Sequence, residues 1–252
     1  GHFCPYYTSW DQTVRDTTRV NQWKREFDSL LKVNAVPQLN TLRIINDHTE
    51  GMSLGRPTPF AHVADNDWAI GLFVEHLSKS PIWEQSVVFI VEDDAQNGPD
   101  HVDAHRTTAY VAGGYVKRGF IDHTPYSTSS MVRTIELILG MKPMSQYDAA
   151  ATPMWRSFSK TPNTKPFQSL PARVDITEVN KKDGPLARKS KTFDFSKEDR
   201  VNDFEFSEVI WKGVRGENSV MPAPKRSAFV RTIDRKSTRL NSSHEWISRM
   251  PS

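Results

Sequence analysis

The chain has 252 residues, of which 37% are hydrophobic and 25% charged, and this is enough for one sizeable core. Its formal net charge of +3 is small and argues against a nucleic-acid partner. The single cysteine, Cys4, excludes an internal disulfide, and no apolar run is long enough to predict a transmembrane segment.

The first part of the chain predicts two helices with a strand between them. A helix is expected from Asp11 to about Lys32, because apolar side chains recur at helical spacing and charged ones fill the other face. After Pro37 a short strand is expected over Leu39–Ile45. Asp65 or Asn66 is then the predicted N-cap of a second helix that runs to about residue 79.

The middle of the chain continues this alternation. The apolar run Val87–Val91 predicts a strand that is buried on both faces, the kind found in parallel sheets. A further strand is predicted over Thr107–Ala112, and a helix over Ser127–Leu139 with Gly140 just after its end. Because helices and strands alternate over residues 11–140, the pattern favours an α/β domain.

The amino-acid composition changes beyond about Phe158, where proline, lysine and polar residues dominate. One late amphipathic helix is expected around Phe206–Trp211. We therefore expect residues 158–233 to form an irregular extension that wraps the domain of residues 1–157.

The last segment, residues 234–252, resembles the translation of a common short-read sequencing adapter. We expect it to be an artefactual, disordered tail and exclude it from the fold prediction. A gene fragment that ends in adapter sequence would also be expected to lack an N-terminal portion.

Two clusters of acidic and histidine side chains each follow a predicted strand. Carboxylates at the carboxyl end of a buried strand lie where open α/β sheets hold ligands, and crowded carboxylates favour a neutralising cation. Carboxylate oxygen with imidazole nitrogen suits Zn²⁺ or Mn²⁺, and a pair of such ions suits phosphate ester chemistry. The alternative is that these are solvated loop acids, a turn cap and a packed histidine. The candidate metal ligands are Asp47, His48, Asp93, Asp94, His101 and His105.

Other metal and nucleophile motifs fail against the sequence. A calcium-binding hand that starts at Asp93 would match at Asn97 and Gly98, but Ala95 and Ala104 occupy ligand positions. A zinc deaminase needs more cysteines, and a His-Glu-x-x-His motif, a phosphate-binding glycine loop and a Gly-x-Ser-x-Gly elbow are all absent.

Several stretches together resemble the C-terminal half of the alkaline phosphatase superfamily, and more closely its bacterial phosphoesterase branch of phospholipase C-like proteins. The resemblance covers nearly all of residues 11–233. It rests on Asn46-Asp47-His48-Thr49, Val63-Ala64-Asp65-Asn66-Asp67, Glu92 to Thr107, Tyr115-Val116-Lys117-Arg118-Gly119, Ser129 to Gly140, Pro143 to Ala150, Asp194-Phe195-Ser196, Trp211-Lys212-Gly213 and Pro222-Ala223-Pro224.

The resemblance implies a three-layer α/β/α sandwich with a mostly parallel sheet, truncated at the N-terminus. It implies two divalent metal ions, Zn²⁺, Mn²⁺ or Ca²⁺, with Asp47 and His48 as ligands from one loop. Asp93, Asp94 and a final histidine would supply the others, and we prefer His105 to His101 because His105 directly precedes the next predicted strand. Asp94 stands where a histidine is commoner in the superfamily, which favours a harder ion such as Mn²⁺ or Ca²⁺.

The resemblance also implies the activity. The full-length parent would be a phosphoric ester hydrolase acting on a phosphate ester, periplasmic or secreted, in a branch whose members are often fused to a β-propeller. The superfamily takes another metal-binding Asp and a Thr or Ser nucleophile from its N-terminal half. We find no convincing candidate for them before Asp47, so the chain as given is expected to be inactive or nearly so. The alternatives are a non-catalytic cation-binding interaction module and a sulfatase-like or phosphoglycerate-mutase-like enzyme of the same superfamily.

Overall fold

A computed structural model describes residues 3–93, 107–198 and 200–223. Two compact units divide these residues. The first unit contains the described parts of Gly1–Thr49, Phe60–Val91 and Ala109–Glu178, and the second contains those of Glu50–Pro59, Glu92–Thr108 and Val179–Ser252.

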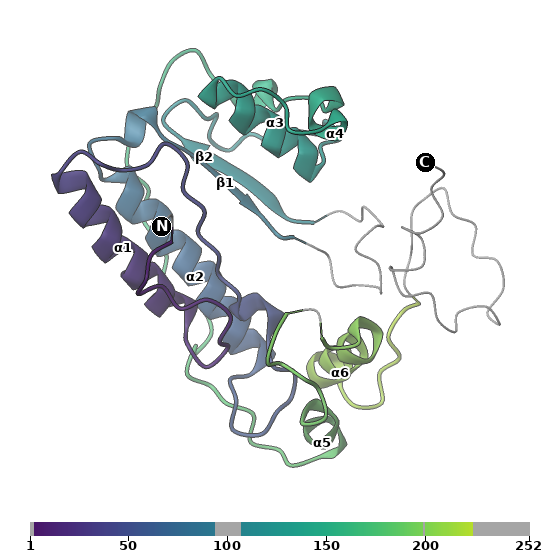
Figure 1. Cartoon of the computed structure of the whole chain (residues 1–252). Helices are drawn as coiled ribbons and strands as arrows, with labels where there is room; N and C mark the ends of the chain where they lie inside the picture. Colours follow the sequence, from purple (N-terminus) through teal and green to yellow (C-terminus); the bar gives the residue numbers. More distant parts are fainter. Residues whose placement is uncertain (1–2, 94–106, 199, 224–252) are drawn as a thin grey trace. The chain divides into compact units, whose positions relative to one another are not determined.

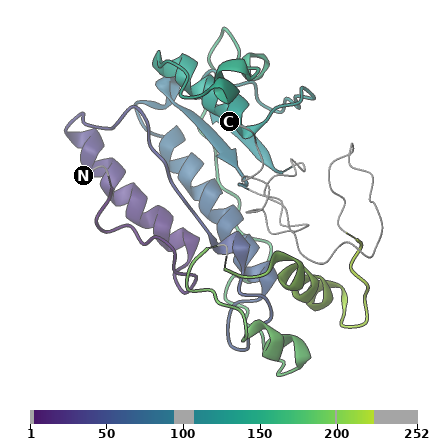
Figure 2. The ribbon, with the colours of Figure 1, turned by 45° about the vertical axis from the view of Figure 1, so that its right-hand side comes forward.

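The first unit is built around two long helices and a pair of strands. Its helices α1 (Asp16–Lys32) and α2 (Pro59–Ser78) lie side by side, and β1 (Val87–Val91) and β2 (Ala109–Gly113) lie next to them (Figures 1 and 2). The strands pair antiparallel, with Val88 opposite Ala112. The strand predicted over Leu39–Ile45 does not form.

The predicted three-layer sandwich with a mostly parallel sheet is therefore wrong: among the described residues there is a single two-stranded antiparallel sheet. The apolar run of β1 has another physical cause. Helices α1 and α2 lie on one side of the strands, and α3 (Thr128–Leu139) and α4 (Gln146–Ala150) lie on the other (Figures 1 and 2). The predicted burial of β1 on both faces is nevertheless only partial: Val88 is buried, the three residues Val87, Phe89 and Ile90 are partly buried, and Val91 is exposed.

Local signals were better guides to the helices than to the sheet. Helix α3 follows Ser127 and ends at Gly140, whose φ of 68° is the left-handed conformation that glycine adopts at little cost. Helix α1 was predicted from Asp11 but begins at Asp16, because the preceding residues form turns.

The shorter elements of this unit are the 3₁₀ turns η1 (Asn46–His48), η2 (Trp83–Gln85) and η3 (Trp155–Ser157).

Helix α2 starts earlier than predicted. Pro59 is its first residue, where a missing N–H costs nothing and the fixed φ suits a helix. Asp65 and Asn66 were expected to cap this helix, but they lie inside it. Their polar side chains are therefore free to bond other segments.

The hydrophobic core of the first unit lies between these helices and the sheet. Its buried members are Phe27, Leu77, Trp83 and Val88. Trp23 joins them through a stacked ring contact with Phe27 at 4.8 Å. The surrounding apolar side chains are Leu31, Val36, Phe73, Ile82, Ile90, Ala112 and Phe167.

The second unit contains helices α5 (Pro185–Ser190) and α6 (Asp203–Arg215). Helix α6 is the predicted late helix, capped by the Asn202 side chain, which accepts from the Glu205 N–H. The loop over residues 50–59 is fastened by Asn180, whose side-chain amide donates to the backbone carbonyls of Gly51, Ser53 and Pro57. No helix in the described part of the chain combines the length and apolar character needed to cross a bilayer.

Candidate metal centre

The predicted ligands Asp47 and His48 lie side by side in the 3₁₀ turn η1 of the first unit. Asn46, before them, is buried, whereas Asp47 and His48 are each half-buried. The turn is anchored by its backbone: the N–H groups of Ile45 and Asn46 donate to the Asp16 carboxylate at 3.1 and 2.7 Å. The turn that carries the two predicted ligands is therefore fastened to the start of α1.

A fully buried ion pair supports this anchor. Asp16 and Arg19 each have a side-chain exposure of 0%, and Arg19 Nη1 lies 2.9 Å from Asp16 Oδ1. Burial raises the pKa of Asp16, and hydrogen bonds from the Asn46 and Ile45 backbone oppose that rise. The Arg19 guanidinium also donates to four backbone carbonyls that precede α1, which satisfies its donors without water. These carbonyls belong to Thr8, Ser9, Asp11 and Val14.

Helix α2 contributes the second half of the support through Asp65 and Asn66. Asp65 Oδ2 accepts from the Asp16 backbone N–H at 2.7 Å and from the Asn46 side-chain amide at 2.9 Å. A carboxylate at the first N–H of α1 also complements the positive end of that helix. Asn66 Nδ2 donates to Asp47 Oδ1 at 2.9 Å, so one predicted ligand is held directly by α2.

His48 is held from the segment that Arg19 fastens. The Trp10 ring meets the His48 ring edge-on, with centroids 5.1 Å apart. Gln12 Nε2 donates to the Thr49 carbonyl at 2.7 Å and lies 3.2 Å from His48 Nδ1. His48 Nδ1 is also 3.2 Å from the Thr49 carbonyl. In the tautomer that donates from Nδ1 to this carbonyl, Nε2 carries the lone pair that a metal ion needs.

Asp47 and His48 are neighbours in the chain, and the structure does not test the predicted ligand set. Asp93 belongs to the second unit. Asp94, His101 and His105 lie outside the described residues. Within the described ranges, no group of three or more His, Cys, Asp or Glu side chains could hold a metal ion.

Sequence reasoning missed the side chains that support the two ligands. An acid and a base three residues apart at the start of a helix, like Asp16 and Arg19, are usual on exposed helix faces, so they gave no signal of burial. Gln12 gave no signal either. Asn66 lies in one of the stretches that carried the family resemblance, but its spacing suggested only a helix cap.

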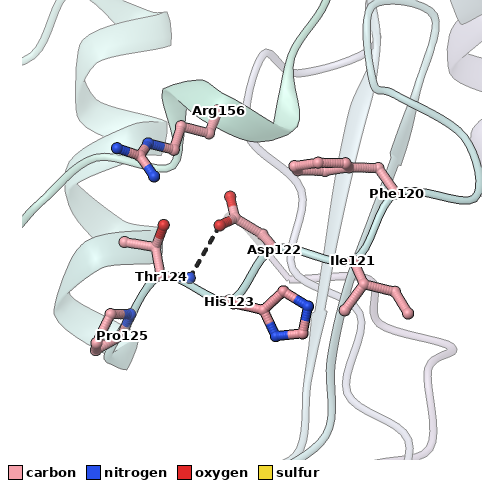
Figure 3. A pocket seen from close by; sticks show the side chains of 7 residues that line it. All are labelled: Phe120, Ile121, Asp122, His123, Thr124, Pro125 and Arg156. Carbon is pink, nitrogen blue, oxygen red and sulfur yellow. Dashed lines mark hydrogen bonds between the residues drawn. The ribbon is translucent and has the colours of Figure 1, made fainter.

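The first unit also has a shallow hollow away from this centre, lined by residues 120–125 and Arg156, with a volume of about 470 Å³. In Figure 3 its carboxylate, Asp122, lies between the side chains of Arg156 and Phe120 and accepts from the Thr124 N–H at 3.0 Å. The Tyr126 hydroxyl donates to the same carboxylate at 3.1 Å. Hydrogen bonds from Thr124 lower the pKa of Asp122, so this carboxylate is an ionised, bonded part of a turn.

Comparison with known proteins gives no relative: no family model, no curated protein and no solved structure matches this chain.

Proposed function

We propose that this chain is the metal-binding part of a metal-dependent phosphoric ester hydrolase. The observation that supports the proposal is the pair Asp47 and His48, adjacent and half-buried on a buried polar network. A carboxylate and an imidazole that share one rigid turn are a suitable donor set for Zn²⁺ or Mn²⁺.

The chemistry of the donors fits a divalent ion. Asp47 Oδ1 is engaged by Asn66, and Oδ2 accepts no hydrogen bond from the described residues. The His48 imidazole is a nitrogen donor of the kind that these ions bind, and the hydrogen bond of its Nδ1 would set its tautomer. A divalent ion bound there would polarise a phosphoryl oxygen as a Lewis acid. Asp47 would neutralise part of its charge, and His48 would fix its direction of approach.

Further ligands stay predictions from the sequence. They are Asp93, Asp94 and His105, with His101 as the alternative to His105. The absence of a nucleophile, the periplasmic or secreted location and the fused β-propeller rest on the family resemblance alone.

The first test is metal binding by the 252-residue chain. Mn²⁺ is titrated into the apo chain, and free Mn²⁺ is followed by its paramagnetic resonance signal. Asp47→Ala and His48→Ala are expected to weaken binding by about 10-fold or more, because each removes a direct ligand. The matched controls are Asp67→Ala and His123→Ala, which remove an exposed carboxylate and an exposed imidazole elsewhere. Binding by the two ligand variants that equals binding by the controls would overturn the proposal.

The second test is hydrolysis by the intact gene product that contains this chain. An aryl phosphate monoester, a diester and an aryl sulfate are compared at saturating Mn²⁺. We expect hydrolysis of a phosphate ester that is lost in Asp47→Ala, since this variant removes a ligand but no other chemical group of the site.

A non-catalytic cation-binding module is the second candidate. Such a module would use the same neighbouring pair, Asp47 and His48, and would need no nucleophile. Mn²⁺ binding that depends on Asp47 and His48, without hydrolysis of any of the three esters, would support this candidate against the hydrolase.

A further inference from the structure

We infer that Asn66 is a positioning residue that orients the Asp47 carboxylate for a divalent cation, an inference that rests on the proposed function. No sequence signal gave this role to Asn66, which was expected only to cap a helix. Its side chain does not belong to the donor set and would act through Asp47.

Both N–H groups of the Asn66 amide are used, and they join two carboxylates of different character. One donates to Asp47 Oδ1 at 2.9 Å and the other to Asp16 Oδ2 at 3.0 Å. Asp16 is fully buried and is itself held by Arg19 and by two backbone N–H groups. The amide therefore ties the half-buried ligand to a group that has no freedom to move.

The placement of Asn66 in α2 adds to this rigidity. The residue lies well inside the helix, where asparagine is a weaker helix former than alanine. A side chain that is unfavourable for its own helix and bonds to two acidic groups is better explained by those bonds than by the helix. A site mounted on a helix is also held more precisely than one on a loop.

The same network contains a residue that serves as an internal comparison. Thr17 Oγ1 donates to Asp65 Oδ1 at 2.8 Å, so it stabilises the network one step away from the ligand. Thr17 forms no hydrogen bond with Asp47. If the network acted only through general stability, loss of either side chain would affect the cation site alike.

The geometry has a direct consequence for the cation. Because Oδ1 is held by Asn66, the carboxylate presents Oδ2 without first losing side-chain rotational freedom on binding. Without the amide, the Asp47 side chain can rotate. Binding a cation must then restrict that rotation, and this loss of entropy weakens the affinity.

The test measures the Kd for Mn²⁺ and the thermal unfolding of the metal-free chain in the same variants. We expect Asn66→Ala to raise the Kd by about 10- to 100-fold, the usual effect of losing a residue that orients a metal ligand. We expect Thr17→Val to lower the unfolding temperature to a similar degree but to leave the Kd within about two-fold. Asn66→Leu, which removes both donors but keeps the side-chain volume, replaces Asn66→Ala if the alanine variant does not fold.

The outcomes separate this inference from the function beneath it. If Asp47→Ala loses Mn²⁺ and Asn66→Ala keeps the wild-type Kd, the positioning role is overturned and the metal site stands. If Thr17→Val weakens Mn²⁺ binding as much as Asn66→Ala, the effect is one of general stability and the positioning role is again overturned. If Asp47→Ala and His48→Ala both bind Mn²⁺ like the wild type, the proposed metal site itself is wrong.

Discussion

The two ends of the α1–α2 pair are built in opposite ways. The helices run parallel, since the start of α1 bonds Asp65 of α2 and Asp28, near its end, contacts His76 at 2.7 Å. Beside their C-terminal halves lies the apolar cluster around Phe27 and Leu77. The N-terminal half of the pair instead buries charges and amides.

The apolar end stabilises the folded unit, whereas the polar end contributes little net stability and holds particular residues in place. Apolar burial stabilises the C-terminal end by roughly 25 cal/mol for each Å² removed from water. The buried pair of Asp16 and Arg19 must first overcome the loss of hydration, and such a pair often contributes little net stability. A costly polar cluster beside two half-buried candidate ligands is better explained by what it holds in place, namely Asn46, Asp47 and His48.

The largest effect is expected when one partner of the buried pair is removed. Arg19→Met leaves the Asp16 carboxylate buried without its cation and frees the carbonyls before α1, so we expect a loss of about 3–5 kcal/mol in the free energy of unfolding. Urea denaturation at neutral pH measures it. The double variant Arg19→Met with Asp16→Asn should recover part of the loss, because it removes the uncompensated charge. A single variant as stable as the wild type would show that the polar end carries no such constraint.

An intermediate effect is expected at the apolar end. Val88→Ala removes two buried methyl groups and leaves a small cavity, which should cost about 2 kcal/mol. The same denaturation experiment measures this loss, and a Mn²⁺ titration of the variant accompanies it. We expect the Kd for Mn²⁺ to stay within about two-fold of the wild type, since no contact of this cluster reaches η1. A large change in Kd would mean that the two ends are not independent.

The sequence predicted the local elements of this chain far better than their assembly. The capped, amphipathic pattern of α3 and the apolar run of β1 were sufficient to find both elements. The direction of β2 could not be read in the same way, because pairing depends on residues far apart in the chain. The apolar run predicted two covered faces, but only Val88 of β1 is buried and Val91 is exposed, so the run located the strand without giving its burial or its partner.

The candidate site divides along the same line. Asp47 and His48 were predicted from residue type and from their place after a strand over Leu39–Ile45. That strand does not form, and the two residues lie on the turn η1 instead. The side chains that hold these two residues were not predicted, because the sequence does not reveal the partner of a polar residue on a helix. Such a residue is then interpreted as solvent-exposed or as a helix cap. Asp65 illustrates the point: it was expected to cap its own helix, but it bonds the first N–H of α1 instead.

The smallest effect is expected at a polar tie on the surface of the apolar end, where Glu75 of α2 accepts from the N–H and hydroxyl of Ser169. Hydrogen bonds from Lys79 and from Ser169 lower the pKa of Glu75 from 4.5 to about 2. Because the folded pKa is below the unfolded one, the contribution is complete above about pH 4.5 and is lost as the pH falls toward 2. Glu75→Gln removes the titrating group, so the difference in unfolding free energy between the wild type and this variant should shrink over that range. The contribution should be modest because the carboxylate is close to solvent, and added salt should reduce it further. Urea denaturation of both proteins at about pH 6 and about pH 3 measures this difference in unfolding free energy. If the difference is the same at the two pH values, the Glu75–Ser169 hydrogen bonds contribute no charge-dependent stability, unlike the buried pair at the other end.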